Sequence, residues 1–212
     1  MLRVGLTGSI AVGKSFVSSA LAGLGCHVLD ADETAREVVA PGTEGLRAVV
    51  ATFGVQVLDG EGKLDRARLA AIVFADAEKR LSLNSILHPL IIAAQDEWMR
   101  AREGEDPDGV AVIDAALMIE TGSYKRFDQI VVVHCLPEVQ LGRLMKRGGL
   151  TREDAERRVA AQMPQQEKMR HADFLIDTSA GFDDTRRQVE RVYEKLRERA
   201  AEKLRDPAPR AG

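Results

Sequence analysis

Close to its N-terminus the chain reads Gly8-Ser9-Ile10-Ala11-Val12-Gly13-Lys14-Ser15. This stretch fits the pattern G-x-x-x-x-G-K-[S/T], in which the backbone N–H groups of a glycine-rich loop hold nucleotide phosphates. Residues 2–6 before it predict a short buried strand, and residues 16–24 after it predict a helix with one apolar stripe. This order of strand, loop and helix points the positive end of the helix dipole at the phosphates. The stretch therefore predicts a nucleotide-binding α/β fold.

The side chains of this loop have separate predicted roles. Lys14 reaches the terminal phosphates, and the Ser15 hydroxyl suits Mg²⁺. The predicted nucleotide contacts within the loop are Gly8, Ala11, Val12, Gly13, Lys14, Ser15 and Phe16. A chance match on a glycine-rich turn is the alternative. The motif alone does not say what, if anything, is phosphorylated.

Composition narrows the class of protein. The chain has 212 residues, 45% of them hydrophobic and 30% charged, which is typical of a globular protein with one core. Its net charge of −3 argues against a nucleic-acid partner, and no apolar run is long enough to cross a membrane. The chain enters a strand at once, so no signal peptide is expected. Cys26 and Cys135 are expected to be buried rather than paired, and we expect a cytoplasmic enzyme.

Apolar strands without alternation recur along the chain, separated by helices. After the first strand, they are predicted at 26–29, 110–114, 129–135 and 174–177. Such strands indicate a parallel five-stranded sheet that helices cover on both faces. Ligands gather at the carboxyl ends of the strands in such a sheet. We therefore expect the glycine loop to share one rim with Asp30, Asp32, Asp114, Cys135 and Asp177.

We expect one domain over residues 1–204, made of a core and an inserted lobe. The core takes about 1–32, 108–146 and 172–204, and the helix-rich stretch of about 33–103 between the second and third strands is an inserted substrate lobe. Helices in the lobe are predicted at 43–53, 64–74 and 76–102, with Thr43 as an N-cap and with Pro89 bending or restarting the last one. Further helices are predicted at 137–146, 151–163 and 182–204. Residues 205–212 are predicted to be a disordered tail.

Acidic residues follow two of the predicted strands. We favour Asp30 as a helix cap and Asp32 as a base that accepts a hydroxyl proton, although either residue could simply cap the helix. Asp114 ends an apolar strand, as does the acid that holds Mg²⁺ in phosphate-loop proteins, and the alternative is a strand-end aspartate without a ligand.

Two arginines lie on one face of the predicted helix after the fourth strand. Arg143 and Arg147 are four residues apart, so both could neutralise the charge of a transferring phosphoryl group. A solvated helix face is the alternative that spacing alone favours. His88-Pro89 by itself indicates a structural kink.

Several segments taken together resemble the dephospho-coenzyme A kinase family. They are 4–8 with 13–15, 28–32 followed by Arg36, His88-Pro89, Gln140-x-x-Arg143-Leu144-x-x-Arg147, Gln162, Glu167-Lys168 and 172–177. The resemblance covers about residues 2–193 in the family's order. The Asp-Ala-Asp and His-Pro elements, with the arginine segment, are more specific than the glycine loop.

This resemblance implies transfer of the γ-phosphate of ATP to the ribose 3′-hydroxyl of dephospho-coenzyme A, with Mg²⁺. It implies a nucleotide core, a helical acceptor lobe and a mobile lid at about 147–170. By the same resemblance Asp32 is the base, Lys14 and Arg143 stabilise the transferring phosphoryl group, and Arg147 belongs to the lid and contacts the nucleotide. Thr7, Asp32, Arg36 and His88 face the acceptor. Partners are limited to these small molecules, and the protein is a monomer or a small homo-oligomer.

The chain departs from the family's pattern at three places. Ser9, Ala11 and Val12 replace two glycines and a serine of the usual loop, and Ala11 and Val12 restrict the backbone more than the residues they replace. The segment 114–120 lacks the family's proline and aromatic residue, and Thr178 stands where the family commonly has asparagine. These changes affect the acceptor contacts and the adenine pocket.

Two other functions remain open from the residues. One is a kinase of the same build that acts on a nucleoside or a nucleoside monophosphate. The other is a non-catalytic nucleotide switch, which would leave the helical lobe and the arginine segment without a purpose.

Overall fold

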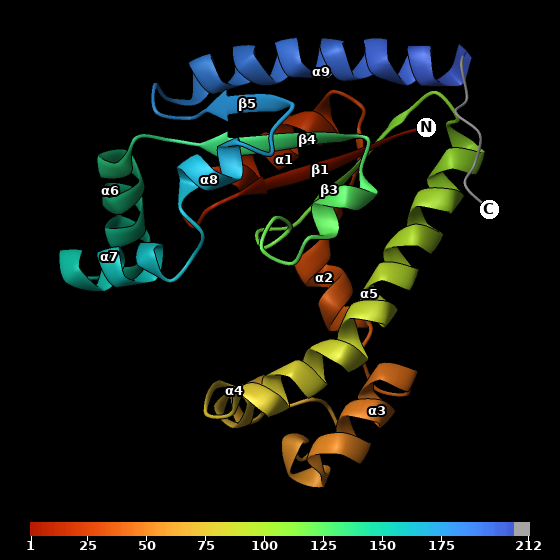
Figure 1. Ribbon diagram of the computed structural model, residues 1–212, viewed down its shortest axis with the longest axis vertical. Coiled ribbons are helices and arrows are strands. Elements are labelled where there is room, and N and C mark those ends of the chain that lie inside the picture. Colours follow the sequence, from red (N-terminus) through yellow and green to blue (C-terminus); the bar gives the residue numbers. More distant parts are fainter. Residues whose placement is uncertain (206–212) are drawn as a thin grey trace. The chain divides into compact units, whose positions relative to one another are not determined.

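A computed structural model describes residues 1–205 (Figure 1). The tail predicted at 205–212 lies, except for its first residue, outside the described residues. By its contacts the chain divides into two compact units. One contains Met1–Leu29 and the chain from Ala101 onward and is called here the sheet unit. The other, Asp30–Arg100, is called the helical unit.

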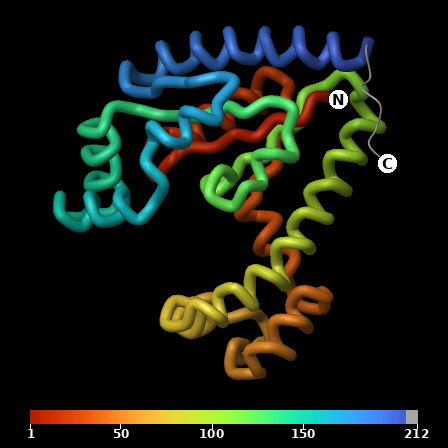
Figure 2. Tube along the Cα trace, viewed as in Figure 1, coloured from red at the N-terminus to blue at the C-terminus, as the bar shows by residue number. Residues whose placement is uncertain are grey.

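Five strands form one sheet in the order β2-β3-β1-β4-β5. Their bounds are β1 Leu2–Gly8, β2 His27–Asp30, β3 Val110–Asp114, β4 Gln129–His134 and β5 Phe174–Asp177. β1 pairs in parallel with β3 and β4, and β4 pairs in parallel with β5. Figure 2 shows the first strand passing between strands that come much later in the chain. The predicted parallel five-stranded sheet is confirmed, although its edge strand β2 is half-buried rather than buried.

Helices follow most of the strands. In the sheet unit they are α1 Lys14–Gly23, α6 Pro137–Gly148, α7 Arg152–Ala160, α8 Gln165–Met169, α9 Phe182–Arg205 and the short 3₁₀ helix η2 Ser123–Arg126. In the helical unit they are α2 Ala31–Glu37, α3 Glu44–Phe53, η1 Val55–Val57 and α4 Arg66–Phe74. The long helix α5, Ala77–Glu105, runs from the helical unit into the sheet unit. Within the described residues, no helix has the length and apolar content needed to span a membrane.

Helices and loops cover both faces of the sheet. Val4 and Leu6 of β1 point to the face that α1 and α9 cover, where they join one core with Leu21 and Leu196. Figure 1 shows α9 lying along the sheet on this side. On the opposite face a Cβ atom at Gly5 would lie 2.4 Å from Met118 Sδ, so the segment after β3 packs directly on the strand there. Helix α8 contacts β4.

The helical unit has a core of its own. The buried residues in it are Val39, Val49, Phe53, Val57, Leu69 and Val73. Thr43 caps α3 as predicted, because its hydroxyl accepts a hydrogen bond of 3.2 Å from Leu46 N. Helix α5 continues without a break through Pro89, so of the two predicted effects, a bend or a restart, the restart does not occur. Proline removes only the N–H that would bond the Ser85 carbonyl, and Ser85 is exposed to solvent.

The predicted helix at 151–163 is shorter in the structure. Thr151 caps α7 by accepting from Asp154 N at 3.2 Å, as the capping motif predicts. The helix ends at Ala160, however, and a second helix begins after Pro164. A residue before proline is pushed out of the helical region, which explains the break. Helix α8 was not predicted.

Both cysteines are buried and free, as predicted. Burial raises the pKa of the Cys26 thiol to about 12, and it also raises the pKa of Cys135. Both thiols are therefore protonated and unreactive near neutral pH.

Candidate functional site

The glycine loop after β1 is shaped by two glycines. A Cβ atom at Gly8 would lie 2.6 Å from the Val133 carbonyl oxygen, so no side chain fits there. Gly13 has a φ of 90° and precedes α1, whose N-terminus has no side-chain cap in the described part of the chain. The N–H groups at the start of α1 are therefore oriented as an anion site needs. Ala11 also has a positive φ, 61°, which L-residues adopt at a cost.

Lys14 and Asp114 meet at the rim of the sheet. The Lys14 ammonium forms an ion pair with the Asp114 carboxylate, which is 6% exposed at the end of β3. Parallel pairing of β1 with β3 brings the two together, since Leu6 and Asp114 are register partners. Ser15 follows Lys14 in the first turn of α1 and is exposed. The sequence predicts both Lys14 and Asp114 for the site, and the structure brings them together.

Arg143 reaches the glycine loop from α6. Its guanidinium donates to the Thr178 hydroxyl and to the Thr178 carbonyl, both at 2.7 Å, and to the Val12 carbonyl at 3.4 Å. The Thr178 hydroxyl in turn donates to the Val12 carbonyl at 2.6 Å. Gly13 leaves room for this arrangement, because a Cβ there would lie 3.3 Å from the Thr178 hydroxyl. Arg147, one turn further along α6, is exposed.

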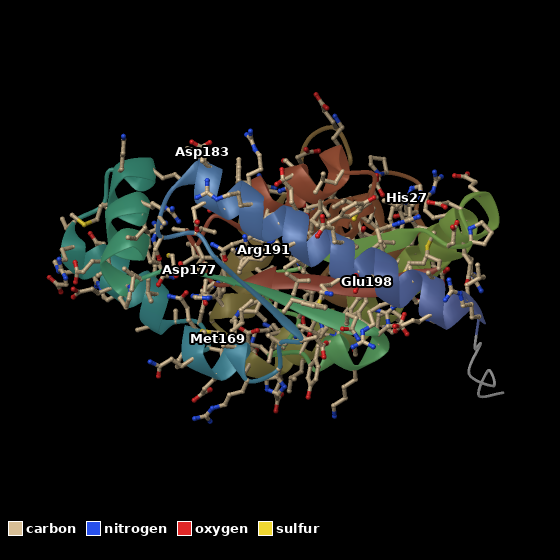
Figure 3. The ribbon with its side chains drawn as sticks, turned by 90° about the horizontal axis from the view of Figure 1, so that it is seen from above. His27, Met169, Asp177, Asp183, Arg191 and Glu198 are labelled. Atoms are coloured by element: carbon tan, nitrogen blue, oxygen red, sulfur yellow. The ribbon has the colours of Figure 1, made fainter. Side chains whose placement is uncertain are left out.

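A pocket of about 380 Å³ opens beside Arg143. It is lined by Gly13, Phe16, Arg143, Thr178, Gly181, Phe182 and Thr185. The rings of Phe16 and Phe182 lie 4.9 Å apart, centroid to centroid. Figure 3 shows Asp177 and Asp183, which lie on either side of the turn between β5 and α9, at the end of the sheet unit where α9 begins. A pocket with two aromatic rings and a few polar groups suits a flat heterocycle.

Sequence analysis did not assign Gly181, Phe182 or Thr185 to this pocket. The sequence feature that could have indicated these residues is the turn Ser179-Ala180-Gly181 after the last strand, because it lies on the same rim as the glycine loop. Thr178 was noted only as a departure from a family pattern. In the structure it is 3% exposed and bonds both the loop and Arg143.

The remaining predicted residues are Asp30, Asp32, Arg36 and His88 in the helical unit and Thr7 in the sheet unit. Asp30 caps α2 as expected, because its carboxylate accepts a 2.8 Å hydrogen bond from Asp32 N. Asp32 and Arg36, one turn apart on α2, are exposed, as is His88 on α5, and all three belong to the helical unit. Thr7 in the sheet unit is fully buried and donates to the Ala116 carbonyl at 3.2 Å.

A divalent cation has oxygen ligands available at this rim. Mg²⁺ is usually held by one or two protein oxygens together with substrate phosphates and water. The Ser15 hydroxyl and the Asp114 carboxylate fit that requirement. Among the described residues no cluster of three or more His, Cys, Asp or Glu residues could hold a metal alone. The residues thus fit Mg²⁺ that is bound together with nucleotide phosphates.

Known proteins of one family resemble the chain over most of its length. The dephospho-CoA kinase family matches residues 2–184. A dephospho-CoA kinase of Streptomyces avermitilis is 44% identical over 200 residues, which is 94% of this chain and 96% of that protein. One from Listeria monocytogenes is 45% identical over 188 residues, 88% of this chain and 92% of the relative.

A solved structure agrees with the sequence relatives. A dephospho-CoA kinase from Campylobacter jejuni superposes with a TM-score of 0.71 at 28% identity, covering 92% of this chain and 97% of that one. A protein from Thermus thermophilus, also 28% identical, gives a TM-score of 0.79 over 92% of this chain and 96% of its own. With the glycine loop, the Lys14–Asp114 pair and Arg143 in place, the match of sequence and fold shows that the chain belongs to the dephospho-CoA kinase family.

Proposed function

We propose that this chain transfers the γ-phosphoryl group of ATP to the ribose 3′-hydroxyl of dephospho-coenzyme A. The products are coenzyme A and ADP, and the reaction is the last step of coenzyme A biosynthesis. The observation that carries the proposal is the gathering of Lys14, Asp114 and Arg143 around the glycine loop in a chain of this family.

The nucleotide binds with its phosphates in the glycine loop and its base in the pocket beside Phe16. Lys14 then exchanges the Asp114 carboxylate for the terminal phosphates, since an ammonium can turn between two neighbouring anions. Arg143 lies against the loop and neutralises the charge that spreads over the transferring group. Arg147 follows on the same helix and adds a second cation. Bound Mg²⁺, held by Ser15 and Asp114, would supply further neutralisation of the phosphates.

Asp32 provides the base. Its carboxylate accepts the proton of the 3′-hydroxyl while that oxygen forms a bond to the γ-phosphorus. The bond from this phosphorus to the β–γ bridging oxygen breaks, and its electron pair leaves with ADP. Asp30 caps the helix, so Asp32 is not needed as a cap. Thr7, Arg36 and His88 complete the proposed acceptor side.

Wider properties follow from the proposal. The partners are ATP and dephospho-coenzyme A, without nucleic acid or membrane, and the protein works in the cytoplasm as a monomer or small homo-oligomer. The proposed lid covers about residues 147–170, and the helical unit serves as the acceptor lobe.

One assay tests the activity. The protein is incubated with Mg-ATP and, in separate reactions, dephospho-coenzyme A, AMP, adenosine or pantothenate, while ADP release is measured. Of the four acceptors, we expect only dephospho-coenzyme A to give fast release of ADP. Release no faster than without an acceptor would contradict the proposal, and preference for AMP or adenosine would show a kinase with another acceptor. Slow hydrolysis that no acceptor changes would indicate a nucleotide switch.

A further inference from the structure

Residues 162–168, called here the strap, are tied to the rim of the sheet by three polar side chains spaced three residues apart. The Gln162 side-chain amide oxygen Oε1 accepts from Ile10 N in the glycine loop at 2.7 Å. The Gln165 side chain accepts from Cys135 N at 3.1 Å. The Lys168 ammonium, fully buried, donates to the Ala116 carbonyl at 2.8 Å and pairs with Glu120 at 2.7 Å. The strap therefore contacts the segments that follow three neighbouring strands, β1, β3 and β4.

The peptide groups of Ile10 are held from both sides. Gln162 accepts from its N–H, and the Gln140 side chain of α6 donates to its carbonyl at 2.7 Å. Gln140 is 2% exposed and accepts in turn from Gln165 at 2.8 Å. Two glutamines of the strap thus fix Ile10, one directly and one through Gln140. Ile10 precedes Gly13 by three residues within the loop that binds phosphate.

The chemistry of these contacts suits a place next to a triphosphate. Every side chain that bonds Ile10 is a neutral amide, which holds the backbone without adding an anion near the phosphates. A carboxylate would make the same bond to the N–H but would repel the nucleotide. Apolar contacts also hold the loop in place, because Ile10 and Ala11 pack against Leu144 of α6 and Ala155 of α7.

We propose that Gln162 is a positioning residue that holds the glycine loop in its phosphate-binding conformation and links that conformation to the end of the lid segment. Gln162 touches the loop backbone rather than the substrate, so it acts through the loop. Loss of the Gln162 side chain weakens nucleotide binding, because the free loop is then less ordered and ordering it on binding costs free energy. The bond between Gln162 and Ile10 involves none of the residues proposed to face the acceptor. The kinetic consequences rest on the proposed function, whereas the binding consequence does not.

The test compares Gln162→Met with Gln166→Met. Methionine keeps the size of glutamine but cannot accept a strong hydrogen bond, and Gln166 is exposed in the same segment. Mg-ADP affinity is measured by calorimetry without acceptor, followed by initial rates with ATP and dephospho-coenzyme A. We expect Gln162→Met to weaken Mg-ADP binding by about 3- to 10-fold, the range for one neutral hydrogen bond. The KM for ATP should rise in parallel, with the KM for dephospho-coenzyme A unchanged.

Equal Mg-ADP affinity in the two variants would overturn the proposal, as would an equal rise in both KM values. If Gln162→Met yields no folded protein, Gln162→Asn replaces it, since its amide is one methylene too short to reach Ile10. If the wild-type protein binds Mg-ADP but does not phosphorylate dephospho-coenzyme A, the proposed function fails. A loss of Mg-ADP affinity in Gln162→Met would still support the role of Gln162.

Discussion

Thr178 joins the glycine loop to Arg143 through a single hydroxyl, which donates to the Val12 carbonyl and accepts from the guanidinium. The substitution Thr178→Val keeps the shape of the side chain and removes both bonds. Of the two lost bonds, only one is made by the Arg143 guanidinium, which keeps its bond to the main-chain carbonyl, so the effect on kcat should match one hydrogen bond. We expect kcat to fall by about 5- to 10-fold, from a net value near 1 kcal/mol. Steady-state rates at saturating ATP and acceptor provide the measurement.

The control for Thr178 is Thr178→Ser, which keeps the hydroxyl. It should have a kcat close to that of the wild type. If the serine variant is as slow as the valine variant, keeping the hydroxyl does not preserve kcat, and the prediction is wrong.

Asp32 is exposed on α2, and Asp30 takes the capping role beside it. Asp32→Asn removes the proton acceptor without changing its shape. We expect turnover to fall by about 10²-fold or more, the usual effect of losing an acid–base group, while Mg-ATP still binds. Glu33→Gln changes the next exposed acid on the same helix and should leave turnover near the wild-type value. Wild-type turnover in Asp32→Asn would rule out this residue as the base.

At the scale of elements, α8 depends on a buried charge for its attachment. Lys168 is fully buried and makes both of its polar contacts with the segment after β3. Lys168→Met keeps the aliphatic part of the side chain but leaves Glu120 without its partner. Because Glu120 keeps some contact with solvent, we expect a loss of about 1–3 kcal/mol in the free energy of unfolding, less than for a fully buried pair.

Urea denaturation measures this loss. Lys146→Met, which removes an exposed lysine from the last turn of α6, is the matched control and should change the free energy of unfolding little. Equal stability of the two variants would show that the Lys168–Glu120 pair contributes nothing to the attachment of α8.

At the scale of the whole molecule, the sequence predicts the parallel sheet and the rim at which the glycine loop and Asp114 meet. Strands such as Gln129–His134 are apolar throughout, and a glycine loop between a strand and a helix has few other uses. The carboxyl ends of parallel strands share a rim, so the meeting of Lys14 and Asp114 was predictable. The partners of Arg143 were not, because they depend on the backbone path of a turn that follows the last strand.

The polar contacts made by α8 and by the residues just before it could not be predicted from the sequence either. Helix α8 has five residues, too few for a periodic pattern, and a proline interrupts the segment before it. Gln162 before α8 bonds the glycine loop and Gln165 in α8 bonds Cys135 N, both through amide side chains, which carry no charge pattern that a sequence would reveal. The buried Lys168 contradicts the usual expectation that lysine is exposed, and only the tertiary structure shows why it is tolerated.

The two units should respond to different ligands. The phosphate loop and the aromatic pocket both belong to the sheet unit, whereas the proposed base and the acceptor residues Arg36 and His88 belong to the helical unit. Mg-ADP should therefore slow local amide hydrogen exchange in residues 8–16 and 178–185 and leave residues 30–100 nearly unchanged. Coenzyme A, the proposed product, should slow exchange in residues 30–100.

The size of this effect follows from mass action. A ligand present at 100 times its Kd stabilises the state it binds by about 2.7 kcal/mol, which slows exchange through local opening of the bound segment by about 100-fold. Amides that exchange only through global unfolding slow down everywhere and are excluded from the comparison, because they report total stability rather than contact. If Mg-ADP alone protects residues 30–100 through local opening as strongly as residues 8–16, the nucleotide contacts both units. The division of substrates between the units would then be wrong, whichever acceptor the enzyme uses.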